Sequence, residues 1–400
     1  MLLLYNLGVW FYFCLISVAS FFNKKAKAWI NGRKNVSYQH FQKSAWFHFA
    51  SLGEFEQGLP VLTSYKASNP GLKVIITFFS PSGYEIRKNT PYADAVYYLP
   101  LDTPGNARKF INAINPSIAI FTKYEYWYHF FNELHRNHIP LFVISAIFRP
   151  DQVFFKQYGG LHRKMLGFVT CFFVQDEDSK LLLQKLGIDK VSVSGDTRFD
   201  RVWANTQNPK TFPLIEEFKN GQKVFIAGST WPEDEALVAQ LVDDNPDWKF
   251  IFAPHEISEE KISRLLDLLP NSTIRYSKLA TDYLPQTLII DNIGMLSSLY
   301  QHGDIAYIGG GFGAGIHNTL EAAAFGLPLI FGPNYQKFKE AKDLIALQVG
   351  FSISNENELK KAVAYLMEDE ERYRAISGQI KDYVKGNIGA TEIIMGYINS

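Results

Sequence analysis

Cysteine is scarce in this 400-residue chain, which has only Cys14 and Cys171. Two cysteines are too few for a disulfide framework, and they fit a reducing compartment. Net charge is absent as well, because 40 Lys and Arg residues balance 40 Asp and Glu residues. A neutral chain has no overall attraction to polyanions, so the sequence predicts no nucleic-acid partner.

Metal-binding patterns are also missing. The nine histidines are scattered, and neither an HExxH motif nor a paired-cysteine spacing occurs. We therefore expect a metal-independent reaction with no cofactor. The dinucleotide fingerprint GxGxxG is absent from the first βα unit of either half, which makes a dehydrogenase a poor fit.

Long apolar runs are lacking except at the N-terminus. Residues 1–22 carry no charged side chain, and Lys24, Lys25 and Lys27 follow at once. About 20 apolar residues span a bilayer as a helix, and flanking basic residues stay cytoplasmic. A signal peptide has the opposite charge order. The sequence thus favours a membrane-anchor helix over 1–22, with the remaining chain on the cytoplasmic side; the family resemblance described below implies that this membrane is the inner membrane. A helix lying in the interface and a buried core helix are the alternatives.

The rest of the chain alternates short apolar runs with amphipathic helical patterns. This alternation is typical of parallel sheets covered on both faces. The polar stretch 200–220 interrupts it and predicts a linker. We therefore expect two doubly wound α/β domains, 23–205 and 206–400, facing a central cleft, with a last helix that can cross back. The predicted strands are 46–51, 73–80, 95–99, 118–122, 140–145, 171–175, 190–194, 223–229, 249–253, 287–290, 304–308 and 328–331.

The segment GGGFGAGIHNTLEAAAFGLP (309–328) follows a predicted strand and enters a predicted helix. Glycines allow close backbone approach, and a helix start attracts anions, so we expect a nucleotide phosphate here. A glycine turn shaped only for packing is the alternative. The run ExxAxGxP is a signature of nucleotide-binding domains in GT-B glycosyltransferases and favours the first interpretation. The predicted donor-site residues are Ser229, Thr230, His255, Gly310, Gly311, Gly313, Gly315, His317, Asn318 and Glu321.

Glu54 follows a predicted strand and the turn Ser51–Gly53, so it should open a helix at the carboxyl end of the sheet. A carboxylate there can take a proton from an acceptor hydroxyl. Burial would raise its pKa, whereas a helix start would lower it, and the sequence leaves that balance open. A purely structural role in the helix's first turn is the alternative.

Further motifs occur in an order that resembles the 3-deoxy-D-manno-octulosonic acid (Kdo) transferases of lipopolysaccharide assembly. They are HFASLGE at 48–54, TFFSPSG at 77–83, YLPLDTP at 98–104, ExW at 125–127, GST at 228–230, Pro-His at 254–255 and the HNxxE segment at 317–321. The family's ETELWPN element reads KYEYWYH here, and the arginine of its NAR segment is missing beside Ser145. Arg149 is a candidate replacement.

The resemblance implies transfer of Kdo from CMP-Kdo to a lipid A precursor resembling lipid IVA, with inversion and with Glu54 as the general base. It also implies contacts to the acceptor or the sugar from Ser51, Gly53, Ser82, Gly83, Lys123 and Glu125. Two rival functions remain. One is a GT-B transferase that uses a UDP-sugar in envelope glycolipid synthesis, and the other is a non-catalytic, membrane-attached nucleotide-binding protein.

Overall fold

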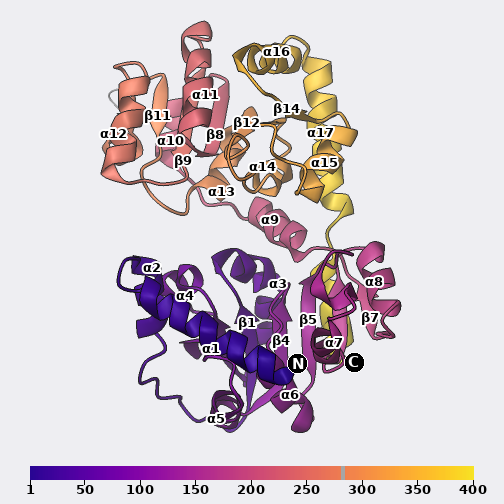
Figure 1. Ribbon diagram of the computed structural model, residues 1–400. Helices are drawn as coiled ribbons and strands as arrows, with labels where there is room; N and C mark the ends of the chain where they lie inside the picture. Colours follow the sequence, from indigo (N-terminus) through magenta and orange to yellow (C-terminus); the bar gives the residue numbers. More distant parts are fainter. Residues whose placement is uncertain (281–283) are drawn as a thin grey trace. The chain divides into compact units, whose positions relative to one another are not determined.

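The computed structural model describes residues 1–280 and 284–400. It divides into two compact units, which are shown with their helices and strands in Figure 1. The first, called the N-terminal unit, comprises residues 1–201 together with 388–400. The second, called the C-terminal unit, comprises residues 202–387.

The N-terminal unit is built on a seven-stranded parallel sheet in the order β3-β2-β1-β4-β5-β6-β7. Its strands are β1 (Ser44–Phe49), β2 (Lys73–Phe78), β3 (Ala95–Tyr98), β4 (Pro116–Thr122), β5 (Leu141–Ala146), β6 (Cys171–Val174) and β7 (Val191–Val193). Its helices are α1 (Leu2–Ala19), α2 (Lys24–Asn31), α3 (Leu52–Ser68), α4 (Pro81–Arg87), α5 (Pro104–Ile114), α6 (Tyr128–Arg136), η1 (Val153–Phe155), α7 (Gly160–Leu166), α8 (Glu177–Gln184) and α18 (Ala390–Asn399).

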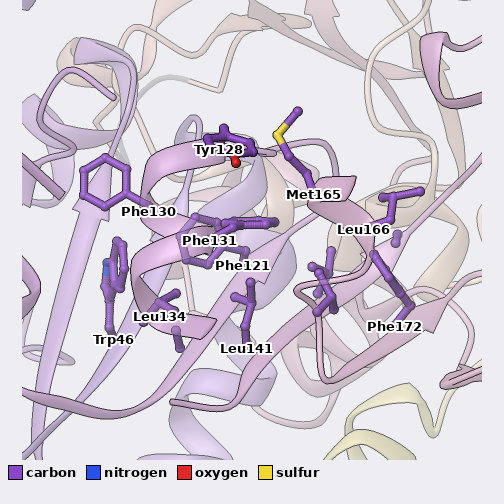
Figure 2. Close-up of a cluster of buried hydrophobic side chains, with 14 of the residues drawn as sticks. Trp46, Phe121, Tyr128, Phe130, Phe131, Leu134, Leu141, Met165, Leu166 and Phe172 are labelled. Atoms are coloured by element: carbon purple, nitrogen blue, oxygen red, sulfur yellow. The ribbon is translucent and has the colours of Figure 1, made fainter. Parts of the chain in front are cut away.

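The core of this unit lies on both faces of the sheet. All six residues of β1 are buried, and neighbouring side chains point to opposite faces, as a strand requires. Trp46 packs edge-on against Phe121 and Phe130 on one face, as Figure 2 shows. Phe47 belongs to the opposite cluster, which includes Met395 of the returning helix α18. Burial on both faces explains why these strands read as unbroken apolar runs.

The C-terminal unit repeats this design with a second parallel sheet in the order β10-β11-β9-β8-β12-β13-β14. Its strands are β8 (Val224–Thr230), β9 (Lys249–Pro254), β10 (Ile274–Arg275), β11 (Thr287–Ile289), β12 (Ile305–Ile308), β13 (Leu329–Phe331) and β14 (Gly350–Ser352). Its helices are α10 (Pro213–Lys219), α11 (Pro232–Asp244), α12 (Glu259–Leu268), η2 (Tyr276–Lys278), α13 (Leu296–Leu299), η3 (Tyr300–His302), α14 (Leu320–Ala324), α15 (Lys339–Ala346), α16 (Glu356–Met367) and α17 (Glu370–Gly386).

The predicted strands are all present, close to their expected positions. The strands β10 and β14 were not predicted, because two or three residues are too few to show a pattern. The stretch 200–220, predicted as a linker, contains the division between the two units after Arg201, but it is mostly helical, because α9 (Thr197–Gln207) and α10 cover most of it. Pro213 begins α10, a position where proline favours a helix, so the proline there does not mark a loop.

Helix α1 lies on the surface of the N-terminal unit. None of its residues is buried, so the core-helix interpretation of the N-terminus was wrong. Within the described residues it is the single helix whose length and composition suit a membrane span.

We expect Phe121→Ala to lower the free energy of unfolding by about 3–5 kcal/mol, because Phe121 is fully buried between Trp46 and Phe131. Urea unfolding followed by circular dichroism measures this. The matched control is Tyr158→Ala, which removes an exposed ring and should change stability by less than about 0.5 kcal/mol. Equal effects of the two substitutions would contradict the core described above.

Candidate functional site

Glu54 stands at the carboxyl end of β1, in the first turn of α3. Ser51 precedes the helix in an extended conformation, and Glu54 Oε2 turns back to accept the N–H of Ala50 at 2.6 Å. The expected position at the sheet edge is therefore confirmed. Glu56, two residues further on, pairs instead with Arg87 at 2.5 Å and Arg201 at 3.0 Å.

The pKa of Glu54 is raised from its ordinary value of 4.5 to about 7. Burial is the largest cause, and the nearby charge of Glu125 adds to it. The hydrogen bond from Ala50 and the charge of Lys123 lower the pKa by less. Burial and the charge of Glu125 thus outweigh the two interactions that lower this pKa.

Glu125 is oriented by a chain of hydrogen bonds that the sequence did not reveal. Trp46 Nε1 donates to Thr77 Oγ1 at 2.8 Å, and Thr77 Oγ1 lies 2.8 Å from His48 Nδ1. His48 Nε2 lies 3.2 Å from Glu125 Oε2, which also accepts from Trp127 Nε1 at 2.9 Å. A neutral His48 with its proton on Nε2 satisfies every partner, with the Thr77 hydroxyl donating to Nδ1. His48 and Thr77 are fully buried, so this chain is rigid.

Two further strand ends carry unusual backbone angles. Lys123 follows β4 with φ 59°, and Ser145 in β5 has φ 50°. Residues other than glycine rarely adopt this region, and such strain gathers at functional sites. The Ser145 hydroxyl is 2.8 Å from Thr197 Oγ1.

Arg149 acts electrostatically on Tyr124. Burial raises the pKa of the Tyr124 phenol, the charge of Arg149 opposes that rise, and the charge of Glu54 adds to it. Tyr124 is therefore within electrostatic range of both side chains. Arg149 is exposed, and no arginine stands beside Ser145 itself.

The remaining predicted residues of this unit differ in their surroundings. Gly53 has open space where a side chain would be, and Ser82 is exposed. Gly83 is buried, and a Cβ there would lie 2.3 Å from the ring of Phe78, so packing alone requires a glycine. Trp127 precedes α6 and stacks on Phe79 at 5.0 Å between ring centroids.

The glycine-rich loop of the C-terminal unit follows β12. Gly310 has φ +91°, and a Cβ on Gly311 would lie 2.6 Å from the backbone of Gly332. A Cβ on Gly315 would meet Phe338 at 2.9 Å, whereas Gly313 has no neighbour nearer than 3.7 Å. Tight packing therefore explains most of these glycines, and Gly313 is the one with room beside it.

Asp234 in α11 holds this loop in place, and sequence reasoning missed it. Its Oδ2 accepts the N–H groups of Gly310 at 2.8 Å and Trp231 at 2.9 Å. Its Oδ1 accepts the hydroxyl of Tyr307 at 2.7 Å. The third helical position after a strand is where a capping carboxylate is expected, and that signal was available in the sequence.

Three aromatic rings stack beside the loop. His255 packs on both Trp231 and His317, with centroid distances of 5.0 Å and 4.3 Å. Trp231 Nε1 donates to His317 Nε2 at 3.0 Å. Because an indole N–H only donates, His317 carries its proton on Nδ1. Burial, followed by the neighbouring His255, lowers the pKa of His317 to about 4, so the ring is neutral at pH 7.

The other predicted donor-site residues differ in their exposure and in their hydrogen bonds. Ser229, at the end of β8, has φ 54° and is partly exposed. Thr230 is buried and donates to Glu235 at 3.2 Å. Asn318 donates to Glu321 at 3.0 Å and accepts the N–H of Leu320, so its side chain is engaged at the start of the short helix α14. With five residues, α14 offers a weaker dipole than the sequence suggested.

No cluster of three or more metal-ligating side chains occurs among residues 1–280 and 284–400. Metal independence stays a prediction.

We expect Glu54→Gln to stabilise the fold at pH 8 by roughly 1–3 kcal/mol, with little effect at pH 4. The folded pKa is raised, so the stability that Glu54 contributes is present below pH 4.5 and is lost as pH rises towards 7. Urea unfolding at the two pH values measures this. Glu56→Gln is the control, because it breaks ion pairs and should not stabilise at pH 8. A destabilised Glu54→Gln at pH 8 would contradict the raised pKa.

Comparisons with known proteins agree with this architecture. The family model described as 3-deoxy-D-manno-octulosonic-acid transferase (kdotransferase) matches residues 24–201. The 3-deoxy-D-manno-octulosonic acid transferase of Chlamydophila psittaci is 30% identical over 345 residues, which cover 82% of this chain and 78% of that one. The transferase of the same name from Haemophilus influenzae is 27% identical over 368 residues, covering 88% and 85%.

Solved structures show the fold. The UDP-GlcNAc 2-epimerase of Neisseria meningitidis is similar with a TM-score of 0.64 at 17% identity, covering 89% of this chain and 99% of that one. A glycotransferase of kitacinnamycin has a TM-score of 0.55 at 11% identity, covering 88% and 97%. The two parallel sheets are thus those of a GT-B fold. The sequence relatives carry the assignment further: the chain belongs to the 3-deoxy-D-manno-octulosonic acid transferase family of glycosyltransferases.

Proposed function

We propose that this protein transfers Kdo from CMP-Kdo to a lipid A precursor resembling lipid IVA, with inversion and with Glu54 as the general base. The observation that supports this best is the raised pKa of Glu54, about 7, at the carboxyl edge of the sheet. The protein's membership of the Kdo transferase family supports Kdo as the transferred sugar.

Glu54 suits the deprotonation of a sugar hydroxyl. A general base is most effective when its pKa lies near the working pH, because it is then ionised and still basic. Burial, together with the nearby charge of Glu125, keeps the pKa of Glu54 high. After the proton moves from the acceptor hydroxyl to Glu54, the alkoxide oxygen attacks the anomeric carbon, and CMP leaves with the bonding electrons.

Cationic groups near Glu54 suit an anionic substrate. Kdo carries a carboxylate, and lipid A precursors carry phosphates, so both would be attracted by Lys123 and Arg149. The charge of Lys123 acts on Glu54, and the exposed Arg149 acts on Tyr124, on which Glu54 also acts. We propose that Arg149 provides the guanidinium that is missing beside Ser145.

The donor side of the proposal rests on the C-terminal unit. Neutral His317 has its Nδ1–H available as a donor, because Nε2 already accepts from Trp231. Ser229 offers a hydroxyl at a strained strand end. Uncharged donors of this kind stabilise a leaving phosphate without a metal ion.

The protein would act at the cytoplasmic face of the inner membrane, where α1 and the lysines of α2 hold it.

The deciding experiment is mass spectrometry of the products formed from CMP-Kdo and lipid IVA. We expect added Kdo, with none transferred when UDP-GlcNAc replaces CMP-Kdo. Glu54→Gln should reduce kcat by roughly 10²–10⁴. Glu56→Gln, whose carboxylate is in ion pairs, should keep near wild-type activity. Full transfer by Glu54→Gln would exclude it as the base, and transfer from UDP-GlcNAc alone would overturn the donor.

The pH profile tests the electrostatic part of the proposal. We expect kcat/KM to rise with pH and to reach half of its limiting value near pH 7, because Glu54 must be ionised to act. Glu125→Gln should move this rise to lower pH, since it removes a like charge, and Lys123→Met should move it to higher pH. The position of the rise is measured, whatever the loss in rate. Shifts in the same direction for both variants would contradict the model.

A further inference from the structure

Helix α1 has two different sides. Its half-buried positions are 5, 6, 9, 13, 16, 17 and 19, which form one broad stripe along the helix. The opposite side covers an arc of roughly 140° at 3.6 residues per turn. The residues on this arc, each more than half exposed, are Leu3, Leu4, Leu7, Phe11, Trp10, Leu15 and Val18.

The half-buried stripe is attached to the N-terminal unit near its start and at its middle. Tyr5 donates its hydroxyl to Asp102 Oδ2 at 2.5 Å, and Asn6 Oδ1 lies 2.7 Å from His129 Nε2. Further along, the ring of Tyr12 packs against Trp29. Figure 1 shows α1 drawn along this unit, with the chain's N-terminus at its far end from α2.

The bond from Tyr5 is costly to break. Asp102 is 2% exposed, and it also accepts the N–H groups of His129 at 3.1 Å and Phe130 at 3.1 Å, at the start of α6. Removing a hydroxyl donor from a buried carboxylate leaves part of its charge without a partner. The start of α1 is therefore tied to the unit by polar contacts, as well as by apolar packing.

These contacts are incompatible with a transmembrane orientation. An 18-residue helix is about 27 Å long, close to the roughly 30 Å hydrocarbon core of a bilayer. If α1 crossed that core, Tyr5 and Asn6 would lie towards its far side. They could not then reach Asp102 and His129 on a unit that remains in the cytoplasm.

We propose that α1 does not span the membrane but lies flat in its cytoplasmic interface, with the stripe against the N-terminal unit and the exposed arc in the lipid. The occupant of that arc is the surface of an anionic bilayer. Phe21 and Phe22 are 83% and 90% exposed directly after α1, and Lys24, Lys25 and Lys27 follow them. An apolar helix side beside a basic cluster is the arrangement that binds such surfaces.

This orientation also brings the lipid surface to the candidate base. Tyr12 packs against Phe79 with ring centroids 6.1 Å apart, and Phe79 stacks on Trp127. Trp127 donates to Glu125, whose charge acts on Glu54. A lipid acceptor in the same bilayer would therefore meet Glu54 without leaving the interface. This part of the inference rests on the proposed function, whereas the orientation of α1 does not.

Disulfide trapping in isolated membranes tests the orientation, in a Cys14→Ser background that leaves buried Cys171 in place. We expect Asn6→Cys with His129→Cys to cross-link in most chains under mild oxidation, because the native side chains are hydrogen-bonded. Leu7→Cys with His129→Cys is the matched control and should not cross-link, since Leu7 is on the exposed arc. Absence of the first cross-link would overturn the proposal. So would a disulfide between Leu7→Cys residues of two copies, because the arc would then be a dimer contact.

Protease protection of an epitope placed before Met1 gives a second, independent readout. The flat orientation predicts digestion in inverted membrane vesicles and protection in spheroplasts. Digestion in spheroplasts would overturn it while leaving the membrane location and Kdo transfer intact. Flotation with phosphatidylglycerol vesicles should exceed flotation with phosphatidylcholine vesicles. Failure to float with either would overturn both the orientation and the proposed location, but not the transfer assay, which does not depend on it.

Discussion

Parallel pairing of β1 with β4 is the constraint on which the candidate base depends. The register aligns His48 with Phe121, so both strands end at the same edge of the sheet. The turns that follow bring Glu54 and Glu125 within electrostatic range of each other. Two carboxylates this close repel, and the partly buried position weakens the screening of that repulsion by solvent. The buried chain through His48 and Thr77 keeps Glu125 in place, so the repulsion acts on the pKa of Glu54.

In the C-terminal unit too, neighbouring parallel strands end at one edge of the sheet, but the residues that follow them are of a different kind. The neighbouring strands β9, β8 and β12 end beside one another and carry His255, Ser229 and the glycine-rich loop. Here the organising group is a single buried carboxylate, Asp234, which binds backbone N–H groups from two of these ends. The resulting site is rich in neutral donors. One unit thus offers ionisable carboxylates and the other offers uncharged hydrogen-bond donors, as acid–base chemistry and phosphate stabilisation respectively require.

In the flat orientation proposed above, the N-terminal helix would connect this chemistry to a lipid surface. Composition alone predicts that α1 is a membrane helix, because its 18 uncharged residues are long and apolar enough to span a bilayer. The polar contacts of Tyr5 and Asn6 add information that composition does not contain, namely which side of the helix is already occupied. A helix with one occupied side has only one side left for lipid, and this is the basis for the flat orientation.

The sequence by itself determined the alternation of elements, the family resemblance and the position of Glu54, because periodicity, glycine turns and strand-to-helix junctions are local signals. It also located the glycine-rich segment, but it could not separate glycines needed for packing, such as Gly311, from one with space beside it, Gly313. Nor could it find Asp234, His48 and Thr77 as partners of distant residues, or assign the proton of His317. Only the tertiary structure decided these points. The pKa of Glu54, the tautomer of His317 and the occupied side of α1 all depend on groups far away in the chain, which sheet pairing and burial bring into contact.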